Sequence, residues 1–81
     1  MHVTVRLHAQ AADLAGTRES GADLAVGATC ADVKRALAER HPRLERLVAS
    51  SVLASDSEYL TDGAPVTDGA SLHLIPPVSG G

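Results

Sequence analysis

Apolar and polar residues alternate at the start of the chain. Val3, Val5 and Leu7 take every second position, and polar residues stand between them. A period of two places alternate side chains on the same face of a β-strand. The pattern therefore predicts an opening strand with one buried face. A short run of helix formers follows over residues 9–15, and Gly16 is expected to end that helix.

The spacing becomes helical in the middle of the chain. Val33 and Leu37 lie four residues apart, on the stripe that an α-helix would turn toward a core. Thr29 is a favourable N-cap residue, and Pro42 cannot continue a regular helix. The pattern predicts one main helix over about residues 30–41, and a shorter helical segment over 44–48.

The remaining apolar runs are short and predict further strands. A segment over 18–26 is expected to pair with the opening strand, with Leu24 and Val26 directed inward. In the last segment, Leu72 and Leu74 are expected to face the core and His73 the outside. The three later strands are expected over residues 52–54, 58–60 and 71–75. Eight residues are expected to form one core: Val3, Val5, Leu7, Val33, Leu37, Leu53, Leu72 and Leu74. Two Thr-Asp-Gly sequences, at 61–63 and 67–69, indicate turns.

The order of these elements is strand, strand, helix, strand, short strand, strand. One long helix packed across a small mixed sheet satisfies that order, which is the α+β arrangement called the β-grasp or ubiquitin-like fold. We expect about five strands, one main crossing helix and short extra helices. The first and last strands would lie side by side in parallel, because the helix supplies the long crossover that parallel neighbours need.

Composition restricts the classes of function. The chain has 81 residues, a formal net charge of −3 and a single aromatic residue, Tyr59. We therefore expect one domain with little volume for an enclosed catalytic pocket. The negative charge argues against a nucleic-acid partner. No signal peptide and no membrane-spanning run is recognised, so a cytoplasmic protein is expected. Cys30 is the only cysteine and is expected to be a buried structural residue.

The last residues read HLIPPVSGG and predict a flexible tail over 76–81 after a domain over 1–75. Pro76 lacks an N–H group and cannot continue a sheet, so the last strand should end at Ile75. Two prolines favour a stiff, extended chain, and Gly80 and Gly81 have no side chains. Six extended residues reach roughly 20 Å. This is the geometry of a probe that enters a narrow slot in another protein.

The special group of such a probe is its terminal carboxyl. A free α-carboxylate is ionised and unreactive near neutral pH, and it must be activated, most simply as an acyl-adenylate. The sequence contains no phosphate-binding loop of the Gly-x-x-x-x-Gly-Lys-Ser/Thr type, so the activating machinery is expected in a partner. A sulfur nucleophile could then displace AMP and leave a thiocarboxylate, without help from a cysteine of this chain.

Three segments carry a resemblance to a known family. PPVSGG, LTDGAPVTDGASLHLIPP and VRLHAQAADLAG resemble the tail, the closing segment and the opening strand and helix of small, sulfur-carrying subunits of molybdopterin synthase. The resemblance implies that a ubiquitin-activating-enzyme-like adenylyltransferase uses ATP to adenylate Gly81, which then becomes a thiocarboxylate. The large catalytic subunit would receive the tail, and sulfur would pass to cyclic pyranopterin monophosphate to form the molybdopterin dithiolene. No stably bound cofactor is implied.

The resemblance also indicates recognition residues. Five tail residues would be recognised together with the carboxyl of Gly81: Pro76, Pro77, Val78, Ser79 and Gly80. We expect a protein interface at Arg6, His8, His73 and Ile75. Family members often carry an aromatic residue where this chain has Ile75 or Leu7-His8, and an Asn where it has Asp56. No metal site is expected, because scattered surface histidines are commoner than a convergent cluster.

Three other functions remain open on the sequence alone. The chain could carry sulfur for another pathway, such as thiazole biosynthesis. It could be a ubiquitin-like protein modifier, although Lys34 is its only lysine and offers little scope for chains built on itself. It could also be a plain β-grasp binding module. In each case no catalytic activity is expected of the isolated chain.

Overall fold

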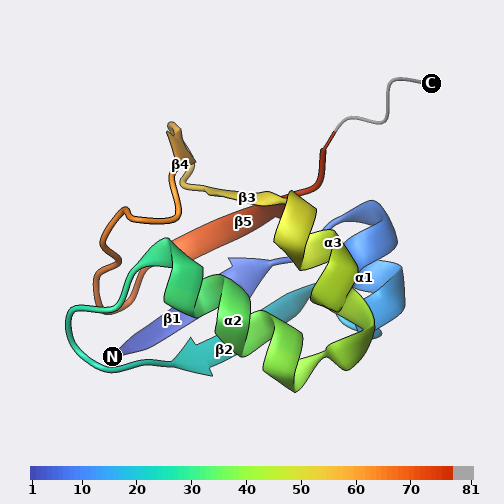
Figure 1. Ribbon diagram of the computed structural model, residues 1–81, viewed down its shortest axis with the longest axis horizontal. Helices are drawn as coiled ribbons and strands as arrows, with labels where there is room; N and C mark the ends of the chain where they lie inside the picture. The colour runs from blue at the N-terminus through green and yellow to red at the C-terminus, as the bar shows by residue number, and fades with distance from the viewer. Residues whose placement is uncertain (78–81) are drawn as a thin grey trace.

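The computed structural model describes residues 1–77 (Figure 1). In chain order its elements are β1 (His2–Arg6), α1 (Ala9–Ala15), β2 (Glu19–Asp23), α2 (Cys30–Arg40), the 3₁₀ turn η1 (Pro42–Leu44), α3 (Glu45–Ser50), β3 (Val52–Ala54), β4 (Tyr59–Leu60) and β5 (Ser71–Ile75). The five strands form one sheet in the order β2-β1-β5-β3-β4. Strand β1 runs parallel to β5, and the other neighbours are antiparallel. The predicted β-grasp fold is confirmed.

Helix α2 crosses one face of the sheet and is fixed at its start by local hydrogen bonds (Figure 1). The backbone N–H of Thr29 donates to Oδ2 of Asp32 at 2.9 Å, and the Thr29 hydroxyl donates to the same oxygen at 3.2 Å. These contacts satisfy a backbone N–H group just before the helix. They also lower the pKa of Asp32, first through the backbone hydrogen bond from Thr29.

The core lies between α2 and the sheet. It contains residues from the alternating pattern of the strands and from the helical pattern of α2. Eight residues were expected to be buried together, and all of them are: Val3, Val5, Leu7, Val33, Leu37, Leu53, Leu72 and Leu74. The 3₁₀ turn and α3 close one end of this core with Leu44 and Val48. Since side chains alternate along β5, its leucines face α2 while His73 and Ile75 occupy the opposite face of the sheet.

The prediction for residues 18–26 was wrong at its C-terminal end. Strand β2 stops at Asp23, and Val26, expected to face inward, is 92% exposed. The N–H of Leu24 still donates to the carbonyl of Met1, but the chain then turns toward α2. Gly27 allows this turn with a φ of 90°, a left-handed conformation that glycine adopts readily. Ala28, beyond the turn, takes the buried position instead.

Within residues 1–77, no helix has the length and apolar character needed to cross a bilayer. The longest is α2, with 11 residues. A bilayer span needs about 20 residues of helix.

We predict that Leu74→Ala lowers the free energy of unfolding by about 2–5 kcal/mol, because the side chain is fully buried and its loss leaves a cavity. Val26→Ala provides the matched control and should change it by less than about 0.5 kcal/mol. Urea denaturation followed by circular dichroism measures both values. Equal effects of the two substitutions would contradict this description of the core.

We also predict that Asp32 contributes to the pH dependence of stability. Its pKa is lowered in the folded protein, so its stabilising contribution is present above the unfolded pKa of about 3.9 and is lost as pH falls through the folded value. Asp32→Asn should lower stability at neutral pH, and the difference from wild type should shrink toward about pH 2. Denaturation midpoints across this range measure it, and a difference that is the same at both ends would refute the assignment.

Candidate functional site

The tail leaves the domain from the middle of the sheet. Strand β5 is paired on both sides, with β1 and β3, and it ends at Ile75 as predicted. Pro76 follows directly and is partly buried, whereas Pro77 is exposed. The chain therefore departs from the best-supported strand of the sheet, next to α3 and the start of β3 (Figure 1). A probe that must be aimed at another protein gains a rigid base from this arrangement.

The predicted reactive end lies outside the described residues. Val78, Ser79, Gly80 and Gly81 belong to the part of the chain that the structure does not describe. The assignment of the acceptor carboxyl to Gly81, and of recognition to the tail, therefore stays a prediction. The described part of the site is the base from which these residues continue.

Around this base, the sheet presents a face that α2 does not cover. His73 lies opposite Arg6 on β1 and opposite Ala54 on β3, and Ile75 lies opposite Val52. Tyr59, paired with Ala54, extends the same surface and is 74% exposed. We call the surface made by these residues and His8 the tail-base face: Arg6, His8, Val52, Tyr59, His73 and Ile75.

A hydrogen-bonded chain of three side chains crosses the tail-base face. Nε2 of His8 lies 3.1 Å from Nδ1 of His73, and Nε2 of His73 lies 2.9 Å from Oδ1 of Asp56. Asp56 is presented by a turn in which the hydroxyl of Ser55 accepts from the N–H groups of Ser57 and Glu58. The His73 side chain is 25% exposed, while that of Asp56 is 90% exposed. The central residue of the chain is thus held by both neighbours.

The structure brings the four predicted interface residues to one region, although one of them, His8, lies at the start of a helix and not on a strand. Arg6, His73 and Ile75 lie on strands as expected. His8 lies beyond the first strand, because β1 ends at Arg6 and His8 is the N-cap residue of α1. Sequence reasoning named Asp56 only as a position where family members often carry Asn, and it missed the contact of Asp56 with His73. It could not find this contact because the register of a three-residue strand, β3, carries no local signal.

His2 does not join His8 and His73. Its Nδ1 lies 2.8 Å from Oδ1 of Asp23, and its backbone N–H donates to Asp68. The hydrogen bond with the His2 side chain lowers the pKa of the Asp23 carboxyl. Among residues 1–77, no group of three or more histidine, cysteine or acidic side chains is placed to hold a metal ion.

Cys30 is buried at the start of α2 and has no role at the tail base. Burial raises the pKa of its thiol, and the nearby carboxylate of Asp62 raises it further. The expected structural role of Cys30 agrees with this environment, because a reactive cysteine needs an accessible thiolate.

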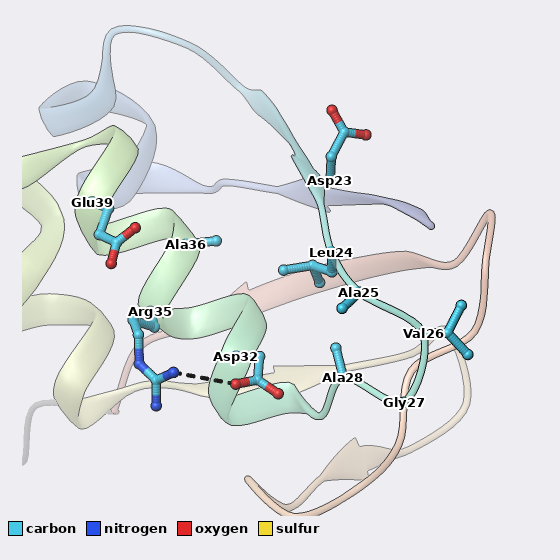
Figure 2. Close-up of a pocket in the computed structure, with 10 residues that line it drawn as sticks. All are labelled: Asp23, Leu24, Ala25, Val26, Gly27, Ala28, Asp32, Arg35, Ala36 and Glu39. Carbon is cyan, nitrogen blue, oxygen red and sulfur yellow. Dashed lines mark hydrogen bonds and ion pairs between the residues drawn. The ribbon is translucent and has the colours of Figure 1, made fainter.

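A hollow lies away from the tail, between α2 and the loop of residues 23–28 (Figure 2). Its rim carries Asp23, Glu39, Asp32 and Arg35, and Nη1 of Arg35 donates to Oδ1 of Asp32 at 3.3 Å. None of the predicted site residues lines it. The tail-base face is therefore the only candidate site that combines these residues in the described part of the chain.

Comparison with known proteins identifies the family. The model of the ThiS family matches residues 5–81, which is nearly the whole chain. The chain belongs to the ThiS family. This ThiS-family chain is 35% identical over 81 residues to the molybdopterin synthase sulfur carrier subunit of Arabidopsis thaliana, covering 100% of this chain and 84% of the relative. It is 31% identical over 83 residues to the protein of the same name from Chlamydomonas reinhardtii, with 100% of both chains covered. The resemblance noted in the sequence is confirmed.

Solved structures support the same fold. SAMP1 from Haloferax volcanii is similar with a TM-score of 0.87 and 31% identity, over 100% of both chains. A protein–protein complex of subunits 1 and 2 of molybdopterin-converting factor from Helicobacter pylori contains a chain of the same fold, with a TM-score of 0.67 and 21% identity over 100% of both chains. At that identity the second likeness supports the fold alone.

We predict that the Cys30 thiol reacts slowly with a disulfide reagent in the native protein. Its raised pKa reduces the thiolate fraction near neutral pH, and its burial blocks access. The rate of colour release from Ellman's reagent, compared between native and urea-unfolded protein, measures this effect. The native rate should be lower by at least about tenfold. Equal rates would show that the thiol is accessible.

Proposed function

We propose that this chain is the sulfur-carrier subunit of a molybdopterin synthase. In this proposal a partner adenylates the α-carboxyl of Gly81 with ATP and releases pyrophosphate. A sulfur donor then displaces AMP and leaves a thiocarboxylate. The large catalytic subunit takes up the tail, and the sulfur passes to cyclic pyranopterin monophosphate to form the dithiolene. The chain has no activity alone and serves as a co-substrate.

One observation carries the proposal. The Pro-Pro-Val-Ser-Gly-Gly sequence begins immediately after the central strand of a β-grasp sheet. Paired on both sides, β5 fixes the direction in which Pro76 and Pro77 leave. The prolines stiffen the first part of the tail, and its last two residues have no side chains to obstruct a narrow channel. The two curated relatives that carry the name of this subunit support the same assignment.

The tail-base face is the surface that we assign to the partners. It lies beside the exit of the tail, so a protein that receives the tail must approach it. Val52 and Tyr59 are 43% and 74% exposed and provide apolar area, while Arg6 and the histidines provide polar contacts. Interfaces commonly combine apolar and aromatic anchors with a polar rim in this way. The two relatives named molybdopterin synthase sulfur carrier subunit support a large subunit as the partner.

A second candidate function is that of a ubiquitin-like protein modifier. The observation in its favour is the similarity to SAMP1 of Haloferax volcanii, the small archaeal modifier protein 1. In such a role Gly81 would be joined to a lysine of another protein. The chain offers little for linkage to itself, because Nζ of Lys34 is bound to Asp62 at 3.1 Å and its side chain is 13% exposed.

We predict that activation raises the intact mass by about 16 Da, because sulfur replaces one oxygen of the terminal carboxyl. The measurement is mass spectrometry after incubation with the activating partner, ATP and a sulfur source. Deleting Gly81 should abolish molybdopterin formation by shortening the probe by about 3.3 Å. Gly81→Ala keeps the reach and should impair activation less.

Neither change removes a core contact. The free energy of unfolding, measured by thermal denaturation, should therefore change by less than about 0.5 kcal/mol. An unchanged mass would argue against any carrier role. Mass gain with no molybdopterin formed by the large subunit would favour another sulfur pathway. Conjugates of the chain in a lysate that depend on Gly81 would favour the modifier role.

A further inference from the structure

The carboxylate of Asp56 fixes where His73 carries its hydrogen. An ionised carboxylate only accepts hydrogen bonds, so Nε2 of His73, at 2.9 Å from it, must be the protonated nitrogen. A neutral imidazole holds one such hydrogen. Nδ1 of His73 therefore has a free lone pair, and it points to the neighbouring ring of His8.

The position of the ring hydrogen on His8 follows from its position on His73. Nε2 of His8 lies 3.1 Å from the free lone pair, so it must donate. The two rings are nearly parallel, at 16°, and their centres are 5.4 Å apart, so they meet through these nitrogens and not face on face. Nδ1 of neutral His8 is consequently an unprotonated acceptor. His8 is exposed, and no hydrogen bond to this nitrogen occurs within residues 1–77.

We propose that Asp56, His73 and His8 form a relay that makes Nδ1 of His8 an acceptor for an N–H donor of the large subunit, and that one added proton turns it into a donor. The identity of the partner rests on the proposed function. The relay itself is a property of this chain alone.

The reversal does not depend on which ring takes the proton. If His8 takes it, Nδ1 gains a hydrogen directly. If His73 takes it, both of its nitrogens donate, one to Asp56 and one to Nε2 of His8, and the hydrogen of His8 must then reside on Nδ1. Both arrangements keep the two hydrogen bonds of the relay. A second proton would place hydrogens on both facing nitrogens and break the contact between the rings.

Charged groups surround the relay unevenly. Arg6 and Arg18 line a hollow together with His8, and the nearest residues of α1, Ala9 and Ala12, are uncharged. On the His73 side the neighbours are Asp56 and Glu58, with the phenol of Tyr59. The two guanidinium groups thus lie on the His8 side of the relay, and the carboxylates lie on the His73 side. The reversal at Nδ1 of His8 holds whichever ring takes the proton.

The relay lies beside the start of the tail, so the hydrogen position on His8 affects docking. His73 lies two residues before Ile75, where the tail begins its departure, and the His8 ring lies beside it. A partner that receives the tail covers this surface. A lone pair that is covered without a donor costs free energy, so the partner should supply one. After proton uptake the same donor would face another donor, and the contact would be lost.

Nitrogen NMR of the full-length chain, labelled with ¹⁵N, tests the relay without any partner. Near neutral pH, Nδ1 of His8 should be unprotonated and Nε2 protonated, and a coupling across the hydrogen bond should link Nε2 of His8 to Nδ1 of His73. Asp56→Ala should weaken or remove that coupling. Asp23→Ala, which removes the carboxylate beside His2, is the matched control and should leave it unchanged. A protonated Nδ1 on His8, or no coupling in the wild type, overturns the relay.

Calorimetric titration of the cognate large subunit tests the docking part. Between about pH 8 and about pH 5.5, the range in which imidazoles change charge, wild-type affinity should fall about threefold to tenfold more than that of His8→Asn. The Asn side chain keeps an acceptor in place of Nδ1 but does not titrate. His2→Asn should retain the wild-type pH dependence.

Equal pH dependence of wild type and His8→Asn overturns the docking part. If the large subunit binds neither protein at any pH, both the proposed function and the docking part fail. The NMR result still decides the relay in that case, so the two failures are distinguishable.

Discussion

The parallel pairing of β1 with β5 is the contact on which the rest of this structure depends. It joins residues 4–6 to residues 71–73, nearly the full length of the chain apart. It places β5 at the centre of the sheet, between β1 and β3. Parallel neighbours need a long connection between them, and α2 lies within that connection. The same helix buries the leucines of β5. The segment that connects the parallel strands therefore also forms one side of the core.

A central strand lets a small domain use both of its faces. On one face Leu72 and Leu74 are covered by α2, and on the other His73 and Ile75 remain available for contacts with partners. A shift of one residue in the register of β5 would exchange these faces and expose the leucines. The core therefore fixes which side chains stand on the tail-base face. A chain of 81 residues thus needs no separate scaffold for the proposed binding surface.

The chain separates its chemistry from its stability. Its one thiol is buried with a raised pKa, so it is a poor nucleophile in the folded protein. Its polar cluster near the tail is made of imidazoles and a carboxylate, groups suited to recognition and to proton uptake. In the proposed role, the reactive bond forms and breaks at the end of the tail, where no core contact is at risk. Membership of the ThiS family agrees with this division.

The sequence alone determined the elements and the identity of the core. Its two periods located the strands and α2, and all eight expected core residues are buried, because burial of an apolar face is what the period records. It also identified the end of β5 at Ile75, since proline cannot continue the ladder. Only the tertiary structure decided that Val26 is exposed and that His8, His73 and Asp56 form one chain. These outcomes depend on the direction of loops and on strand register, which arise from contacts between residues distant in the sequence.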